Sequence, residues 1–371
     1  MSTNYDSRLQ NLKQRRQGST QEQLAKAVVA LDSIYGRTLQ ESYEKRSAKK
    51  ATRYALGALQ EVDPEYTKNS YTQGDRVKNQ LAKGLQGEIQ ITFEYQGSVP
   101  LNVHIRGISD IDLLVLHANY LTVDTYGAKN QRGGYVDWSG DSGPLLLTRM
   151  RSRSASVLRL AFPEVNVAVG DKSIALSGGS LTRKVDVVPS HWHDSADYQL
   201  SGQIKDRAVC ILDASVNTII KNFPFLHMHY INVKDSLSVG GTKKMIRLLK
   251  TLKADSDYSN FISLNSYDIA SLVWHFQTHS LIVQRWSELS LVAVAKEELT
   301  NLVGDKARVM QLKTPDGTRC IINSEEKFTA LVFLYSEVIE LSESIAKEVL
   351  GSVDAVSNDR ILRALKTAVV A

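Results

Sequence analysis

Residues 106–114 read Arg-Gly-Ile-Ser-Asp-Ile-Asp-Leu-Leu, and eleven residues separate the pair Gly97-Ser98 from Asp110. The apolar run from Ile111 to Leu116, interrupted only by Asp112, predicts a buried strand. Alternate residues of a strand project to the same face, about 7 Å apart at Cα, so Asp110 and Asp112 would point together while Ile111 faces the core. Two carboxylates so placed can hold hard divalent cations that share their coordination with substrate phosphates.

A third carboxylate is expected from a neighbouring strand, because two seldom suffice for two metal ions. The run Lys184-Val-Asp-Val-Val188 offers Asp186 between apolar residues. Two Mg²⁺ or Mn²⁺ ions about 4 Å apart can stabilise the attacking and leaving oxygens of a phosphoryl displacement. We therefore predict Asp110, Asp112 and Asp186 as both the metal ligands and the catalytic residues.

Gly97-Ser98 follows a stretch that alternates with period two, Ile89 to Tyr95, which predicts another strand. A glycine at a strand end lets the backbone approach a phosphate closely, and the backbone amides and the serine hydroxyl can donate to it. Gly97 and Ser98 are thus predicted nucleotide-binding residues.

Together, the Gly-Ser turn, the acid pair and the third strand-borne acid resemble the nucleotidyltransferase superfamily that includes DNA polymerase β. Residues 106–114 resemble the bacterial cGAS/DncV-like nucleotidyltransferases (CD-NTases), which make cyclic oligonucleotide signals in anti-phage (CBASS-type) defence. The family often has Gly-Thr or Asn-Thr after Gly-Ser, whereas here Val99-Pro-Leu-Asn-Val-His104 contains Asn102 without a following threonine.

The second half of the chain extends the resemblance. Met245 to Lys253 resembles the family helix that carries a lysine toward the triphosphate; Lys250 is the best match, with Lys243 nearby. Ser266 and Tyr267 match a serine that contacts phosphate and a tyrosine that stacks on the base. On chemistry alone, Ser266 is a plausible helix N-cap beside free amides, and Tyr267 offers a flat face to a base. Simple capping, core packing and a solvated helix face remain the alternatives for Ser266, Tyr267 and Lys250.

The remaining pattern predicts an α+β fold. Residues 1–20 are polar and expected to be frayed, and Thr20 with Gln23 resembles a capping box that opens a helical pattern reaching about Leu59. Further helices are expected over 73–86, 145–162 and 200–222, and strands over 89–95, 111–116, 165–169, 173–176 and 184–188. After Pro224 the pattern is helical, over 240–254, 266–286, 288–303, 326–350 and 358–369, with a hairpin at 313–319.

We therefore expect two domains: residues 1–235 as a polymerase β-like nucleotidyltransferase core with N-terminal helices, and residues 236–371 as a helical lobe. The resemblance implies an active-site cleft between them.

Composition narrows the function classes. The 371 residues include 45 Lys and Arg against 40 Asp and Glu, a net charge of +5 that suits an anionic ligand. Only Cys210 and Cys320 are present, which excludes a disulfide scaffold and a Cys-rich zinc site. Neither an 18-residue apolar stretch nor a secretory h-region occurs, so we expect a cytoplasmic protein with no membrane partner. The His-x-His pairs at 191–193 and 227–229 are interpreted as packing or surface residues.

The predicted function is a Mg²⁺-dependent nucleotidyltransferase that makes a cyclic oligonucleotide second messenger from NTPs, ATP foremost, with regulatory protein partners from a defence operon. One alternative is an enzyme with a linear product, such as oligoadenylate, extended RNA or tRNA, or a nucleotidylated protein. Another is a non-catalytic module that binds nucleotides or a partner. The basic run over 45–53 indicates either a solvated helix face or a nucleic-acid contact, which the predicted function does not require.

Overall fold

The structure is a computed structural model that describes residues 4–17, 41–352 and 355–370. The chain divides into two compact units. The sheet unit comprises residues 63–102 and 109–230, and the helical unit comprises residues 1–62, 103–108 and 231–371. This division differs from the expected boundary near residue 235, because the N-terminal helices pack on C-terminal ones. Arg8, for example, donates to the Glu337 carboxylate at 2.6 Å across 329 residues of sequence.

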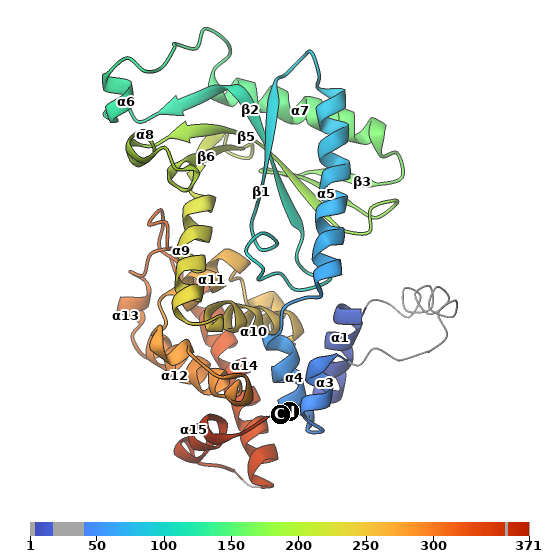
Figure 1. The fold of residues 1–371 in the computed structure, drawn as a ribbon, viewed down its shortest axis with the longest axis vertical. Coiled ribbons are helices and arrows are strands. Elements are labelled where there is room, and N and C mark those ends of the chain that lie inside the picture. The colour runs from blue at the N-terminus through green and yellow to red at the C-terminus, as the bar shows by residue number, and fades with distance from the viewer. Residues whose placement is uncertain (1–3, 18–40, 353–354, 371) are drawn as a thin grey trace. The chain divides into compact units, whose positions relative to one another are not determined.

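The sheet unit is built around one mixed sheet of seven described strands (Figure 1). They are β1 (Ile91–Gln96), β2 (Ile111–Val123), β3 (Asn166–Val169), β4 (Ile174–Ser177), β5 (Val185–Asp194), β6 (Ala208–Asp213) and β7 (Thr218–Asn222). The order is β1-β2-β5-β4-β3, and β6 pairs with both β5 and β7. Strands β2 and β5 are parallel and the other pairs are antiparallel.

Residues 113–116 of β2 are buried on both faces of the sheet, which explains why this part of the strand is apolar throughout. Ile111, Leu113 and Val115 belong to the main core, together with residues of α5 (Pro64–Gly84) and α7 (Gly143–Ala161). Leu114 and Leu116 belong to a second cluster on the opposite face, with Val188, Trp192 and Val209 of β5 and β6. The strand that follows Asp110 is thereby fixed on both sides. The short helices α6 (Ala128–Gln131) and α8 (Ala196–Ser201) complete this unit, and α9 (Pro224–Leu237) runs from it into the helical unit.

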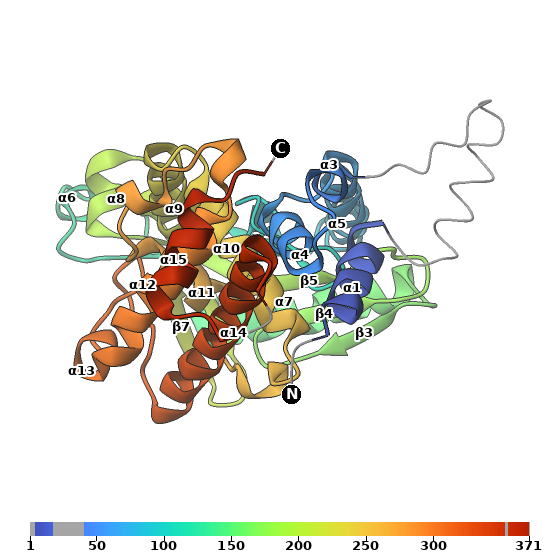
Figure 2. The same cartoon turned by 90° about the horizontal axis from the view of Figure 1, so that it is seen from below.

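The helical unit contains nine described helices besides the end of α9. They are α1 (Tyr5–Gln17), α3 (Ser42–Arg46), α4 (Lys50–Leu59), α10 (Gly241–Asp255), α11 (Ser266–Trp274), α12 (Ser290–Gly304), α13 (Lys306–Val309), α14 (Glu325–Leu350) and α15 (Asn358–Thr367). Helix α4 packs against α1, α10 and α14 (Figure 2). The carboxylate of Glu348 on α14 accepts the backbone N–H groups of Ala51 and Thr52, at 2.8 and 2.9 Å, and so caps the first turn of α4.

Most predicted elements are present with shifted ends, but three predictions were wrong. The helix expected over 200–222 is instead the end of α8 followed by β6 and β7, because β-branched residues such as Val209 and Ile211 pair with the second half of β5. Residues 5–17 form a helix rather than a frayed end. The helix expected over 266–286 ends at Trp274, and 3₁₀ turns follow at His279–Leu281 and Arg285–Ser287. The Thr20–Gln23 capping box lies outside the described residues.

The basic run on α3 and α4 makes mainly intramolecular contacts. Arg46 pairs with the buried Glu288, Lys49 donates to the Glu348 carbonyl, Lys50 pairs with Asp6, and Arg53 donates to the Ser47 carbonyl at 2.8 Å. These contacts favour a structural role over a nucleic-acid contact.

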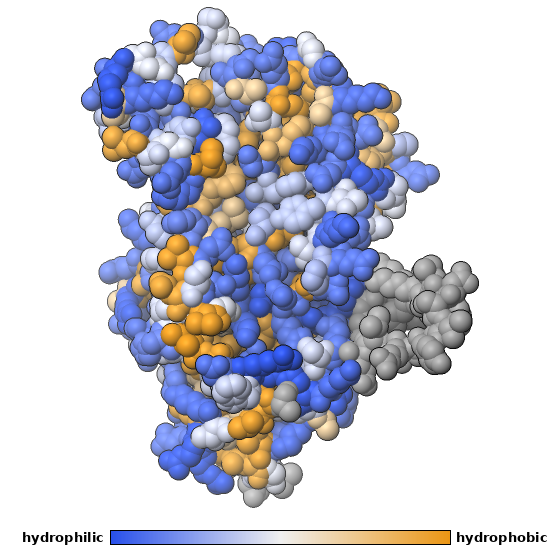
Figure 3. All heavy atoms as spheres, in the orientation of Figure 1, coloured by the Kyte–Doolittle hydropathy of each residue, from blue (hydrophilic) through white to orange (hydrophobic). Residues whose placement is uncertain are grey.

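The face drawn in Figure 3 is largely polar with scattered apolar groups. Over the described parts of the chain, no helix is both long and apolar enough to cross a bilayer.

Candidate active site

The three predicted carboxylates lie at the same end of two adjacent strands. In the parallel pairing of β2 with β5, Asp112 is the direct partner of Asp186. Asp110 precedes β2 by one residue, and Ile111 donates its backbone N–H to the Lys184 carbonyl at 3.2 Å. Alternation along the strands turns Asp110, Asp112 and Asp186 to the face opposite Ile111 and the main core. The sheet thus brings together residues that are 74 positions apart in the sequence.

Asp186 has the features of a metal ligand. One of its carboxylate oxygens, Oδ1, is buried and has no hydrogen-bond partner. Burial raises the pKa of this carboxyl above its ordinary value, the charge of Asp110 raises it further, and Lys184 opposes the shift. A buried anionic oxygen that nothing satisfies is costly, and a divalent cation would satisfy it. The oxygen donors of the acid set fit Mg²⁺ or Mn²⁺.

The backbone of Gly97 lies directly beside Asp112. It follows the last residue of β1, Gln96, which is the strand partner of Asp112. Its backbone φ is +84°, and a methyl group on its Cα would overlap the Asp112 carboxylate, with Cγ only 3.2 Å away. Only glycine leaves this space open. Ser98 beside it is half-buried, so the structure brings the predicted Gly-Ser turn next to the predicted metal ligands.

A lysine outside the predicted set of site residues lies among these acids. The Lys184 ammonium donates to Asp110 Oδ2 at 2.9 Å, and its side chain is 48% exposed. This hydrogen bond raises the pKa of Lys184, and the charges of Asp110, Asp186 and Asp112 add to the effect. Within the described residues, no three His, Cys, Asp or Glu side chains are gathered closely enough to enclose an ion. Lys184 immediately precedes β5 and is two residues from Asp186, so alternation along the chain puts both side chains on one face of the sheet.

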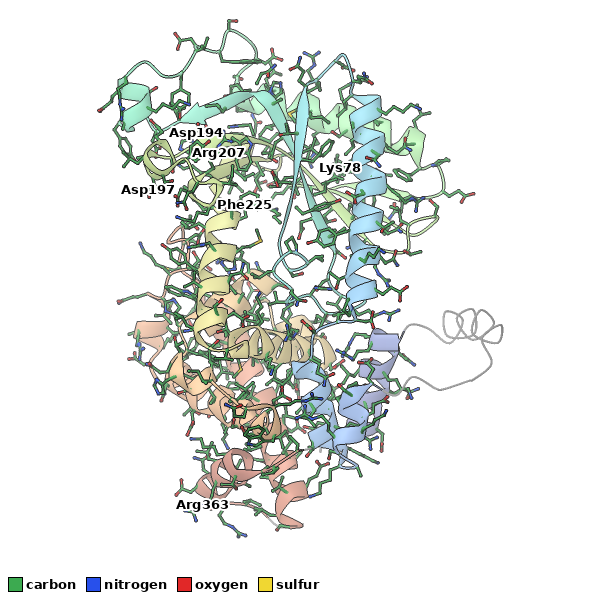
Figure 4. All side chains as sticks on the ribbon, viewed as in Figure 1. Lys78, Asp194, Asp197, Arg207, Phe225 and Arg363 are labelled. Carbon is green, nitrogen blue, oxygen red and sulfur yellow. The ribbon has the colours of Figure 1, made fainter. Side chains whose placement is uncertain are left out.

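A separate polar network lies at the opposite end of β2 and β5. Arg207 pairs with Asp194 at 2.7 Å and stacks on Trp192, against which Phe225 also packs (Figure 4). His191 lies in this region, and its ring meets the Tyr120 ring edge to face, with 4.7 Å between the ring centres. Burial lowers the pKa of His191 to about 4. His191 is therefore a packing residue remote from Asp186, as the sequence indicated for the His-x-His pairs.

In the helical unit, Lys250 lies buried on α10. Its Nζ donates to the Val103 carbonyl at 2.8 Å. Val103 opens the segment 103–108, which belongs to the helical unit although the residues on both sides belong to the sheet unit. Arg106 of the same segment donates to the carbonyl of Arg16 on α1. Lys250 therefore holds the chain a few residues before Asp110, and it is not a solvated helix residue.

Ser266 and Tyr267 are the first two residues of α11. The N-cap is Asn265 rather than Ser266, since the Asn265 side chain accepts the N–H of Asp268 at 2.9 Å. Ser266 is exposed and Tyr267 is half-buried. The Arg319 guanidinium lies 5.4 Å from the centre of the Tyr267 ring, and burial raises the pKa of Tyr267, with Asp316 adding to the shift. Arg319 was not predicted, because its proximity to Tyr267 is a tertiary contact between residues 52 positions apart.

Comparison with known proteins identifies the group to which this arrangement belongs. No protein-family model matches the chain. Cyclic dinucleotide synthase CdnE of Yersinia aleksiciae is 37% identical, over 96% of this chain and 96% of that protein. The structure of the STING-associated CdnE c-di-GMP synthase from Capnocytophaga granulosa is 29% identical with a TM-score of 0.67, and it covers 91% of this chain and 97% of that one.

Rhodothermus marinus CdnE c-UMP-AMP synthase, solved with Apcpp and Upnpp, shares the fold at 14% identity and a TM-score of 0.59, covering 82% of this chain and 98% of that one. The predicted α+β class, a small mixed sheet with a helical portion, is confirmed. Identity over nearly the full length of the Yersinia protein shows that this chain belongs to the bacterial cGAS/DncV-like nucleotidyltransferases, the CD-NTases.

Proposed function

We propose that this CD-NTase joins nucleoside triphosphates into a cyclic dinucleotide second messenger of anti-phage defence, with Asp110, Asp112 and Asp186 as its metal-binding carboxylates. The observation that carries the proposal is the buried, unpartnered Oδ1 of Asp186 beside the strand pair that presents Asp112. The names of the relatives support a cyclic dinucleotide product and place GTP beside ATP among the substrates to test.

Bound Mg²⁺ or Mn²⁺ ions would neutralise triphosphate charge and lower the pKa of the attacking ribose hydroxyl. The residues of the chain itself position the nucleotide. Gly97 leaves room for a phosphate beside Asp112, and the amides of the turn with the Ser98 hydroxyl donate to its oxygens. Tyr267 stacks on a base, and Ser266 donates to the triphosphate. Lys250 is the candidate lysine for the triphosphate, and its bond to the Val103 carbonyl supports a second role in holding the loop.

In the reaction, a ribose hydroxyl oxygen forms a bond to the α-phosphorus and the bond from that phosphorus to pyrophosphate breaks. Pyrophosphate leaves with the electron pair, and the hydroxyl proton passes to solvent. The Asp186 carboxylate orients the hydroxyl. Two such steps, the second within the linear intermediate, close the ring.

The test is label transfer from α-labelled NTPs with Mg²⁺ or Mn²⁺, followed by phosphatase treatment. We expect a phosphatase-resistant product from the wild type and none from Asp112→Asn or Asp186→Asn. Asp141→Asn is the matched control, because Asp141 is a surface carboxylate of the same unit whose contact with Arg149 is 3.8 Å long.

Mass and nuclease sensitivity separate a cyclic from a linear product. A linear product would refute the cyclase assignment while retaining the chemistry. Label transfer that survives both active-site substitutions would refute the assigned acids. Protein that binds NTPs and yields no product with any NTP pair, RNA or lysate would support the non-catalytic alternative.

Cytoplasmic location and control by protein partners of a defence operon belong to the same proposal. Fractionation of cells that express the chain from its own operon, with mass spectrometry of co-purifying proteins, tests both. Recovery in the membrane fraction, or purification without any operon-encoded protein, would count against them.

A further inference from the structure

Lys184 and the acids form a four-residue array at the start of β2 and β5. Ile111 pairs with Val185 in the register, so Lys184 lies across from Asp110 as Asp186 lies across from Asp112. Three corners of the array are carboxylates and one is an ammonium group. The ammonium group donates a hydrogen bond to Asp110 Oδ2 at 2.9 Å.

We propose that Lys184 is a resident counter-ion, which pairs with Asp110 in the metal-free protein and moves away from the acids when a divalent cation binds. The inference rests on the proposed function, since it takes the acids as metal ligands. It makes Lys184 a positioning residue for the metal site and gives the site a lower metal affinity than the acids alone would provide.

The contacts of the array support an exchange of cations. The Lys184 ammonium occupies one oxygen of Asp110, and its positive charge beside the acids repels a divalent cation. Lysine is suited to leaving, because it is a point charge on a flexible four-carbon stem, and nearly half of this side chain is exposed to solvent. The buried Oδ1 of Asp186 has no hydrogen-bond partner, so Lys184 satisfies only part of the acid set.

The experiment measures Mn²⁺ binding to the full chain without nucleotide, from the electron paramagnetic resonance signal of free Mn²⁺. We expect Lys184→Met to bind Mn²⁺ about fivefold more tightly than the wild type, the factor that corresponds to an exposed ion pair of about 1 kcal/mol. Lys184→Arg keeps the charge and should stay within about twofold of the wild type.

Lys172→Met is the matched control. Lys172 pairs with Asp213 at 3.1 Å and is 53% exposed, in the same unit but in an ion pair that involves none of the three acids. Its loss should leave the Mn²⁺ affinity unchanged. Asp186→Asn should weaken Mn²⁺ binding strongly, which identifies the site being titrated.

Thermal unfolding supplies a second readout that a merely structural lysine would not give. Without metal, Lys184→Met should unfold at a lower temperature than the wild type, because three carboxylates lose their counter-ion. At saturating Mn²⁺, Lys184→Met should unfold at the same temperature as the wild type or at a higher one.

An unchanged or weaker Mn²⁺ affinity in Lys184→Met, with binding still sensitive to Asp186→Asn, overturns this inference alone. If Asp186→Asn bound Mn²⁺ with the same affinity as the wild type, the metal site and the inference would be overturned together.

Discussion

Gly97→Ala adds one methyl group at the closest approach of the backbone to the proposed metal ligands. The backbone φ of +84° costs a non-glycine residue about 1–2 kcal/mol. That lowers the unfolding temperature by about 2–8 °C for a unit of this size. The methyl also occupies the space of the Asp112 carboxylate, which must rotate away. Since a displacement of about 1 Å can cost about 100-fold in rate, we expect product formation to fall at least that far.

The matched control is Gly87→Ala. Gly87 has nearly the same backbone conformation, φ +81°, but no atom lies within 4 Å of the position a methyl would take. It should lose similar stability and keep its activity. Rates come from pyrophosphate release with both variants folded at the assay temperature. If Gly97→Ala were as active as Gly87→Ala, the argument from close approach would be refuted. Equal losses in both variants would assign the effect to backbone strain.

Three further substitutions test other parts of the structure. Tyr267→Leu should raise the KM for NTP about tenfold through lost base stacking, while Tyr267→Phe keeps the ring and stays near the wild type in steady-state kinetics. Glu288 is buried, which raises its pKa, but hydrogen bonds from Lys244 and Arg46 outweigh burial and hold the pKa below its ordinary value. Its stabilisation is therefore present above the unfolded-state pKa and is lost as pH falls through the folded value. In urea unfolding, Glu288→Gln should be less stable than the wild type by about 3 kcal/mol at pH 7. As the pH is lowered toward 3, its free energy of unfolding should fall less steeply than that of the wild type. If the two proteins lost stability in parallel, the pairing of Glu288 with Lys244 and Arg46 would be contradicted. Val239 has φ +53° and is 70% exposed, so Val239→Gly should raise the unfolding temperature by a few degrees, and a decrease would show that the strain estimate is wrong.

Local patterns predicted the parts of the fold that depend on local physics. Leu113 to Leu116 are apolar because both faces of this part of β2 are buried, so the strand and the placement of Asp110 and Asp112 on one face could be inferred together. The strands β6 and β7 could not, since their stability comes from pairing along an edge of β5 that the chain reaches only after α8. Helix propensity over 200–222 was overridden by that tertiary pairing.

The same contrast holds at the site. Asp110, Asp112, Asp186 and the Gly97-Ser98 turn carry recognisable spacing, and the structure brings them together. Lys184 was overlooked because a charge before a strand is usually a solvated residue, and only the parallel register sets it opposite Asp110.

The ion pair between Arg8 and Glu337 has a consequence for synthesis. The sheet unit is complete once residue 230 has left the ribosome, whereas α1 meets α14 only after more than a hundred further residues. At about 5–20 residues per second, the buried arginine of α1 and the surface of α4 that packs on α10 and α14 therefore stay uncovered for tens of seconds. A chaperone that engages nascent CD-NTase should accordingly be found on the N-terminal helices, and a chain truncated before α14 should be aggregation-prone through its beginning rather than its end.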